Sequence, residues 1–326
     1  MSRNVFNNTA RGAGYAKTRR LLWSSAAAIG ALAASPAWAA TCLPTVAPPV
    51  ATIAVVSDFL GAAKDLITEF RKPGQPGYGK VIRICHDSTG ALNTEIRSGN
   101  ANHYSLFLAG NLTTPIGLQG TAFVQSGAVA QLYAQGIPAL FARQSTVSNV
   151  STLVPSQSGV SATISYNNLT NDALDTTNAA TVAVADPALA PYGDAAFKIM
   201  SSTPAGMGLF AYPATPLPSP GYLSTPYSNI DSTFQSVAAS PYANKSGFVS
   251  KAQICKGIAP IKSGTPDYVY VEFTGSRYVQ RQAGIRIDSG NSTQNGIGAD
   301  IINYMLNNSD ITFWPNFLTS HCYGQI

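Results

Sequence analysis

The sequence predicts an α/β fold built around a parallel sheet, and three observations support this prediction. Residues 51–56 form a continuous apolar run that is partly β-branched, residues 59–72 carry apolar side chains at helical spacing, and residues 81–98 repeat the order of strand, polar turn and helix. Parallel strands joined by crossover helices give this rhythm. With 326 residues, of which 45% are hydrophobic, the chain can bury sizeable cores, so disorder is excluded as its main state.

The N-terminal residues 1–39 predict a secretory signal peptide. Five basic residues precede Leu21, an apolar run of about 14 residues follows, and Ala37-Trp38-Ala39 is a small-x-small cleavage site. The run is shorter than the roughly 20 residues that span a bilayer, so we expect cleavage rather than a retained anchor. Arg19-Arg20 leaves the export route open between the general secretory and the twin-arginine pathway.

The charge of the chain lies mostly in this leader. The full sequence has a net charge of +5, from 20 Lys and Arg against 15 Asp and Glu, but cleavage after Ala39 removes five basic residues and leaves 15 of each sign. A neutral mature protein has no generic basic surface for nucleic acid. We therefore expect a soluble exported protein that does not bind nucleic acid.

Four cysteines, Cys42, Cys85, Cys255 and Cys322, remain after cleavage. An even number in an oxidising compartment predicts two disulfides, with three pairings open. We favour Cys42 with Cys85, which would brace the N-terminus against an early strand, and Cys255 with Cys322, which would tie down the C-terminus. Their wide separation argues against a zinc site.

The first elements follow from apolar patterns and turn residues. The run 51–56 reads as a buried strand, and Ser57-Asp58 supply cap residues for a helix over 59–72. A second strand over 81–85 leads through the polar turn 86–90 into a helix over 91–98. Both polar turns then lie at the carboxyl ends of adjacent strands, where open α/β sheets bind ligands.

The rest of the chain is less regular. A proline-rich segment, 204–226, predicts an irregular connection, and an amphipathic pattern predicts a helix over 300–306. Short strands are expected at 104–109, 138–142, 181–185, 247–250, 268–273 and 284–287.

Several local strings, taken in their order along the chain, resemble one family. These are Ser57-Asp58, Asp87-Ser88-Thr89-Gly90, Val184-Ala185-Asp186-Pro187 with Ala190-Pro191-Tyr192-Gly193, Asn229-Ile230-Asp231, Gly247-Phe248-Val249-Ser250 and the stretch 301–317. The chain resembles the periplasmic molybdate-binding proteins, the solute receptors of ABC importers, which have the type II periplasmic binding-protein fold. The resemblance covers most of residues 52–317.

This resemblance implies an α/β, two-lobed periplasmic binding protein with parallel-rich sheets flanked by helices and a central ligand cleft. Lobe 1 is expected to comprise 40–139 plus 262–326, and lobe 2 to comprise 140–261. The resemblance also implies a small oxyanion as ligand, the membrane permease of an ABC importer as partner, a periplasmic location, a monomer, and neither a cofactor nor a metal ion.

The resemblance further implies which positions hold the anion. In the first turn Asp58 stands where the family has serine, beside Ser57, and the second turn supplies Thr89 beside Ser88. Backbone N–H groups are expected near Tyr192 and Ile230, and the position of the family's tyrosine falls on Ser250. Helix N-termini can bind a small oxyanion without a neighbouring Lys or Arg, which suits a chain with few charges.

Other interpretations of the same residues remain open. Asp58, Ser88 and Thr89 are ordinary N-cap residue types, so capping alone would explain them. Asp58 with His86 and Asp87 would also suit a metal cation, or a protonated oxyanion such as hydrogen phosphate. An exported hydrolase is a further alternative, although the sequence lacks a Gly-x-Ser-x-Gly elbow and a His-Glu-x-x-His motif. We therefore expect a binding protein rather than an enzyme.

Overall fold

The computed structural model describes residues 40–99, 104–143, 182–201, 210–213, 216–239, 243–255 and 268–326. Within the unit Trp38–Ile326 the chain forms two sheets, each with its own helices. The predicted signal peptide, residues 1–39, and parts of the proline-rich segment lie outside the described residues. Among the residues that are described, no helix has the length and apolarity to cross a membrane.

The first sheet has six strands in the order β1-β3-β2-β4-β10-β5. Its centre is parallel, because β2 pairs in the same direction with both β3 and β4, whereas β1, β10 and β5 run antiparallel to their neighbours. The strands are β1 (Thr41–Cys42), β2 (Ala51–Val56), β3 (Ile82–Asp87), β4 (Tyr104–Ala109), β5 (Gln131–Gly136) and β10 (Gln280–Arg286). The predicted βαβ arrangement is therefore confirmed.

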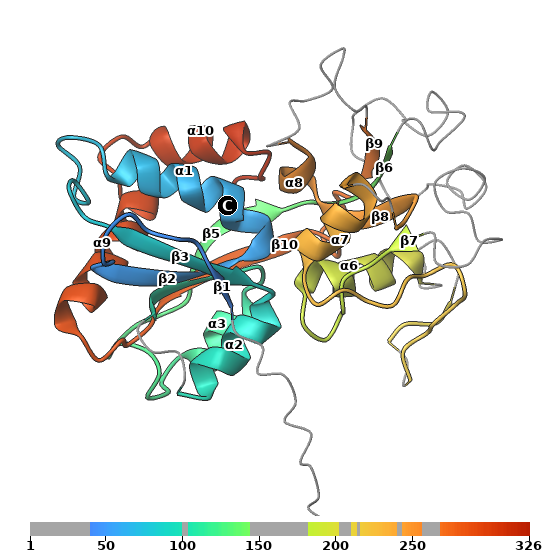
Figure 1. The fold of residues 1–326 in the computed structure, drawn as a ribbon, viewed down its shortest axis with the longest axis horizontal. Coiled ribbons are helices and arrows are strands. Elements are labelled where there is room, and N and C mark those ends of the chain that lie inside the picture. Colours follow the sequence, from blue (N-terminus) through green and yellow to red (C-terminus); the bar gives the residue numbers. More distant parts are fainter. Residues whose placement is uncertain are drawn as a thin grey trace, which may run out of the picture. The chain divides into compact units, whose positions relative to one another are not determined.

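Helices cover both faces of this sheet, and the alternating side chains of β2 explain why. Ile53 and Val55 belong to the core under one layer of helices, and Ala54 belongs to the core under the other. Figure 1 shows α1 and α10 on one side of the sheet and α2 and α3 on the other. The helices are the short 3-10 helix η1 (Ser57–Phe59), α1 (Leu60–Phe70), α2 (Thr89–Arg97), α3 (Thr113–Leu118), α9 (Ser292–Leu306) and α10 (Phe313–Ser320).

The second sheet has four strands in the order β7-β8-β6-β9. Its cores contain aromatic side chains such as Phe141, Phe197 and Phe248, which are all buried. The strands are β6 (Pro138–Arg143), β7 (Val182–Ala183), β8 (Ser246–Ser250) and β9 (Tyr268–Glu272). The helices that accompany them are α6 (Pro191–Met200), α7 (Ile230–Ala238) and α8 (Lys251–Cys255).

The chain passes from one sheet to the other by short connections. Ile137 alone separates β5 from β6, and residues 273–279 separate β9 from β10. The segment 262–326 was expected in lobe 1, but β9 pairs antiparallel with β6 in the four-stranded sheet. The return to the first sheet therefore comes after residue 272, because β9 (Tyr268–Glu272) forms its ladder with β6. The assignment of residues to lobes otherwise stays a prediction.

Several predicted elements need correction at their ends. The helix predicted over 91–98 begins at Thr89, because Ser88 is its N-cap, and the helix predicted over 300–306 begins at Ser292, after the N-cap Asn291. The strand expected over 284–287 begins at Gln280. Seven elements besides the short helix η1 were not predicted from local patterns: β1, β5, α3, α6, α7, α8 and α10.

The disulfide between Cys42 and Cys85 is confirmed. The two residues are directly opposite each other in the antiparallel pair of β1 and β3, which explains why the bond forms. Cys322 is also disulfide-bonded, and the residues that the structure describes include no free cysteine. The side chain of Cys255 is outside the description, so its pairing with Cys322 stays a prediction.

Candidate functional site

A buried carboxylate lies at the carboxyl end of β2, where the chain turns through η1. Asp58 is only 4% exposed, and its Oδ2 accepts hydrogen bonds from Gln282 Nε2 at 2.7 Å and from the Tyr323 hydroxyl at 3.2 Å. The Tyr323 hydroxyl also lies 2.9 Å from the backbone oxygen of Asp58. Both partners come from distant parts of the chain, β10 and the segment after α10, and both are uncharged.

The hydroxyl of Tyr192, on the first turn of α6, extends this network into the second sheet. It accepts from Gln282 Nε2 at 3.1 Å and from Ser250 Oγ at 3.1 Å, and it is hydrogen-bonded to Asp58. Gly136 makes room for it, since a Cβ there would lie 1.8 Å from the tyrosine oxygen. The four side chains Asp58, Gln282, Tyr192 and Ser250 therefore form one buried chain of hydrogen bonds, here called the Asp58 network.

Burial dominates the electrostatics of the Asp58 network. Desolvation raises the pKa of Asp58 from 3.8 to about 6, although the hydrogen bonds from Gln282, Tyr192 and Tyr323 oppose this shift. Burial, with the nearby Asp58 charge as a second cause, raises the pKa values of Tyr192 and Tyr323 well above the ordinary range. The tyrosines are therefore neutral donors, and Asp58 changes its charge near neutral pH.

Buried polar atoms in and beside this network lack hydrogen-bond partners among the described residues. They are Ser57 Oγ, Asp58 Oδ1 and Gln282 Oε1. Ser57 and Asp58 also line a cavity of about 320 Å³, which is enclosed by α1, α7, α8 and the C-terminal segment. Buried polar groups are normally paired, so unpaired ones beside a cavity mark a place where a polar ligand or water binds.

The second polar turn is satisfied from within the protein. Ser88 Oγ accepts from the backbone N–H of Ala91 at 3.3 Å, which is N-capping, and Thr89 Oγ1 accepts from the Gly110 N–H at 2.9 Å. Both side chains are buried. The capping interpretation therefore holds for Ser88. The Thr89 hydroxyl holds the end of β4 and keeps its hydrogen available for donation.

Two contacts join the start of α2 to helices of the second sheet. The Gly90 N–H donates to the Leu189 carbonyl at 2.8 Å, just before α6, and Asn229 Nδ2 donates to Asp87 Oδ1 at 3.1 Å, just before α7. A Cβ on Gly90 would lie 2.9 Å from the backbone of Leu189. The N-terminal ends of α2, α6 and α7 are therefore brought together, and with them the expected positions at Tyr192 and Ile230.

The metal interpretation finds little support in the described part of the chain. There, no three side chains among His, Cys, Asp and Glu come together in a way that could hold a metal ion. The carboxylates that act on His86 are Asp231 and Asp87, and burial lowers its pKa nonetheless.

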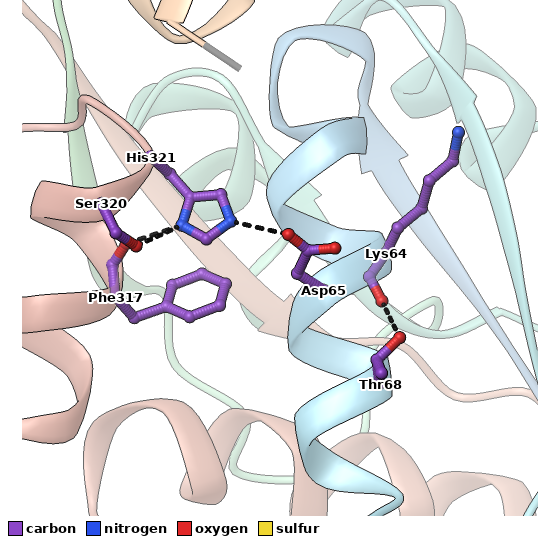
Figure 2. Close-up of polar contacts among 6 residues, drawn as sticks. All are labelled: Lys64, Asp65, Thr68, Phe317, Ser320 and His321. Carbon is purple, nitrogen blue, oxygen red and sulfur yellow. Dashed lines mark hydrogen bonds and ion pairs between the residues drawn. The ribbon is translucent and has the colours of Figure 1, made fainter. Parts of the chain in front are cut away.

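His321 closes one side of the cavity, and Figure 2 shows its contacts. Its Nδ1 lies 2.7 Å from the Phe317 carbonyl, which can only accept, and its Nε2 lies 3.2 Å from Asp65 Oδ2. Ser320 Oγ also lies 2.9 Å from Nδ1. The ring also stacks on Phe317, with centroids 4.1 Å apart. His321 therefore ties the C-terminal segment to α1.

Sequence analysis did not identify two members of this site. Gln282 and Tyr323 bind Asp58 from 224 and 265 residues away, and neither belongs to a recognisable local pattern. Tyr192 was expected to contribute its backbone, but its side chain is what enters the Asp58 network. The resemblance placed Ser250 at a tyrosine position, and in the structure Ser250 donates to the Tyr192 hydroxyl.

The chain is similar to known solute-binding proteins in sequence and in fold. A family model described as bacterial extracellular solute-binding protein matches residues 51–243. The structure of the periplasmic molybdate-binding protein of Azotobacter vinelandii is 18% identical with a TM-score of 0.59, covering 85% of this chain and 99% of that one. The sulfate-binding protein SubI of Mycobacterium tuberculosis is 9% identical with a TM-score of 0.58, covering 84% of this chain and 85% of that one. No curated protein sequence matches the chain. The fold is the mixed α/β fold of two-lobed type II periplasmic binding proteins.

Proposed function

The chain belongs to the family of bacterial extracellular solute-binding proteins, and from that membership we propose that it is the periplasmic receptor of an ABC importer for a small oxyanion. The ligand is held between the two lobes, against the N-terminal ends of α2, α6 and α7 and the turn at Ser57-Asp58. The partner is the membrane permease that takes the anion from the closed receptor.

The observation that carries this proposal is the convergence of helix starts. The Gly90–Leu189 and Asn229–Asp87 hydrogen bonds hold the first turns of α2, α6 and α7 next to one another. The first N–H groups of a helix have no partner within the helix and lie at the positive end of its dipole. The Gly90, Ala91 and Ser232 N–H groups already have acceptors within the protein, so the positive dipole ends of the three helices are what attract an anion here without a cationic side chain.

The side chains around this position add donors. Ser57 Oγ is buried and without a partner, so its hydroxyl is available to an anion oxygen. The Thr89 hydroxyl accepts from Gly110 and can still donate its own hydrogen. The two solved structures reported above are named as molybdate-binding and sulfate-binding proteins, which adds support for a tetrahedral dianion as the ligand.

A second candidate ligand is a protonated oxyanion such as hydrogen phosphate. Asp58 lines the cavity, and its Oδ1 is buried without a hydrogen-bond partner in the described part of the chain. A carboxylate oxygen in that position accepts from a ligand O–H group, whereas a fully ionised tetrahedral anion offers it no hydrogen. This one atom distinguishes the two ligand classes.

A thermal-shift screen tests the proposal. Protein comprising residues 40–326, produced in an oxidising compartment, is heated with molybdate, tungstate, sulfate or phosphate at millimolar concentration. A ligand at 100 times its dissociation constant stabilises the folded state by about 2.7 kcal/mol, which raises the melting temperature by several degrees. We expect at least one of these anions to do so and chloride at matched ionic strength to have no effect. No shift with any oxyanion would contradict the proposal.

A further inference from the structure

We propose that this site binds its anion together with one proton, and that the proton is held between Asp58 and an oxygen of the anion. The inference rests on the proposed function and adds to it a specificity device. It assigns Asp58, which stands where the family it resembles has serine, the role of sharing this proton with the anion, as donor to a dianion and as acceptor from hydrogen phosphate.

The first argument is the position of the two carboxyl oxygens. Oδ2 accepts hydrogen bonds from Gln282 and Tyr323, and the Tyr192 hydroxyl is a further hydrogen-bond partner of Asp58. Asp58 and Ser57 both line the cavity, and Asp58 Oδ1 and Ser57 Oγ are buried without a hydrogen-bond partner among the described residues. An anion bound at this turn would meet these two atoms first. An ionised Oδ1 would repel an anion there, and a protonated Oδ1 would donate to it.

The second argument is that Asp58 has no charged partner that could neutralise it. Its contacts from α6, β10 and the C-terminal segment are uncharged, and Tyr133 from β5 is a neutral phenol as well. The other charged groups that line the cavity are Lys64 on α1, Asp231 on α7 and His321 after α10. The groups that act on the pKa of Asp58 are all uncharged, and Asp231 adds negative charge to the cavity. If Asp58 stayed ionised, an anion beside it would therefore face a carboxylate whose own contacts do not neutralise it.

Protonation of Asp58 removes this repulsion at a small cost in free energy. Because burial raises the pKa of Asp58 to about 6, a large fraction of the molecules already carry the proton near pH 6, and a nearby dianion raises this pKa further. The neutral acid keeps Oδ2 as an acceptor for Gln282 and Tyr323 and gains an O–H donor at Oδ1. The proton can come from two sources. A sulfate or molybdate dianion takes it from the solvent through Asp58, whereas hydrogen phosphate brings its own proton to an ionised Asp58.

Isothermal titration calorimetry of residues 40–326 tests the inference between pH 5.5 and 8.5. Sodium sulfate, sodium molybdate and sodium phosphate are titrated in two buffers of different ionisation enthalpy, which reports proton uptake directly. For the sulfate or molybdate that binds, we expect uptake of about one proton at pH 8 and an affinity that falls about tenfold per pH unit above pH 6. For phosphate at pH 8 we expect uptake near zero.

The variant Asp58→Asn places an amide N–H donor where the protonated acid has its O–H. We expect it to bind the same dianion with an affinity that changes less than threefold from pH 6 to 8, and about 100-fold more tightly than the wild type at pH 8. The exposed Asp310→Asn is the matched control, and it should keep the slope of the wild type. Asp231→Asn tests the other carboxylate on the cavity and should also keep that slope.

Each result has a distinct meaning. Dianion binding by the wild type that does not depend on pH, or a tenfold slope that persists in Asp58→Asn, overturns the inference and leaves the proposed function standing. If Asp58→Asn does not fold, the proton uptake measured on the wild type decides the question alone. If neither protein binds an oxyanion at any pH, the proposed function itself is wrong.

Discussion

The two polar turns of the first sheet differ in how their side chains are satisfied, although they occupy equivalent places. Both follow a parallel strand, β2 or β3, and both consist of short oxygen-bearing residues. In the second turn, Ser88 and Thr89 bond to backbone N–H groups. In the first turn, Ser57 Oγ and Asp58 Oδ1 are buried without a partner among the described residues, and Asp58 Oδ2 accepts from side chains far along the chain. The comparison teaches that residue type identifies a polar turn, while its tertiary neighbours decide whether its side chains find hydrogen-bond partners within the protein.

The largest expected effect comes from removing the disulfide that supports the strand before the second turn. The disulfide Cys42–Cys85 fastens β1 to β3, the strand that leads into Ser88. It closes a loop with a sequence separation of 43, so its loss should lower the free energy of unfolding by about 4 kcal/mol. The double variant Cys42→Ser/Cys85→Ser, compared with the wild type by urea denaturation, measures this. A loss below about 1 kcal/mol would mean that β3 is held by its packing alone.

The next effect concerns the first turn alone. Gly136→Ala would place a Cβ 1.8 Å from the Tyr192 hydroxyl oxygen and 2.8 Å from Gln282 Nε2, so the Asp58 network must shift. Overpacking of this kind costs about 3 kcal/mol of unfolding free energy, and we expect anion affinity to fall with it. Gly296→Ala, in α9, is the control, because a Cβ there meets nothing within 4 Å. Equal unfolding free energies for the two variants would contradict the packing described for Gly136.

The third prediction uses the pH dependence of stability. Folding raises the pKa of Asp58 from 3.8 to about 6, so the folded state binds this proton more tightly than the unfolded chain. The resulting stabilisation is complete below about pH 3.8 and is lost as the pH rises through 6. Asp58→Asn should remove this pH dependence, and at pH 8 its free energy of unfolding should exceed that of the wild type by about 3 kcal/mol. Urea denaturation at pH 4 and pH 8 measures the difference, which must be larger at pH 8 if the sign is right.

The smallest effect compares equivalent serines directly. Ser88→Ala removes the N-cap of α2 and should cost about 1 kcal/mol of unfolding free energy. Ser57→Ala removes a hydroxyl without a partner and should leave the free energy of unfolding within about 0.5 kcal/mol. Anion affinity should show the reverse order, with the larger loss in Ser57→Ala. Calorimetric titration of both variants measures this, and equal affinities would remove Ser57 from the site.

The elements that were predicted with correct bounds are those whose signal lies in a short run of adjacent residues. β2 and β4 have the predicted bounds, since each is a continuous apolar run buried on both faces. α9 was predicted only over its last part, because Gly296 and Gly298 weaken the helical pattern near its start. Gly298 is nevertheless needed, since a Cβ there would lie 2.3 Å from the Ser105 carbonyl of β4. That requirement comes from packing against β4 and cannot be predicted from the periodicity of the helix itself.

The sequence by itself determined the α/β class, the two polar turns at neighbouring strand ends and the presence of Asp58 in the first of them. The tertiary structure alone decided that Asp58 is buried beside a cavity, that Gln282 and Tyr323 bind one of its oxygens, and that the other has no partner among the described residues. The physical reason is the range of the interactions involved. Capping and strand burial depend on a few neighbouring residues and can be predicted from them. Desolvation depends on every segment that packs around a group. Burial among distant segments raises the pKa of Asp58, and the hydrogen bonds that oppose this rise include those from Gln282 and Tyr323, more than 200 positions away.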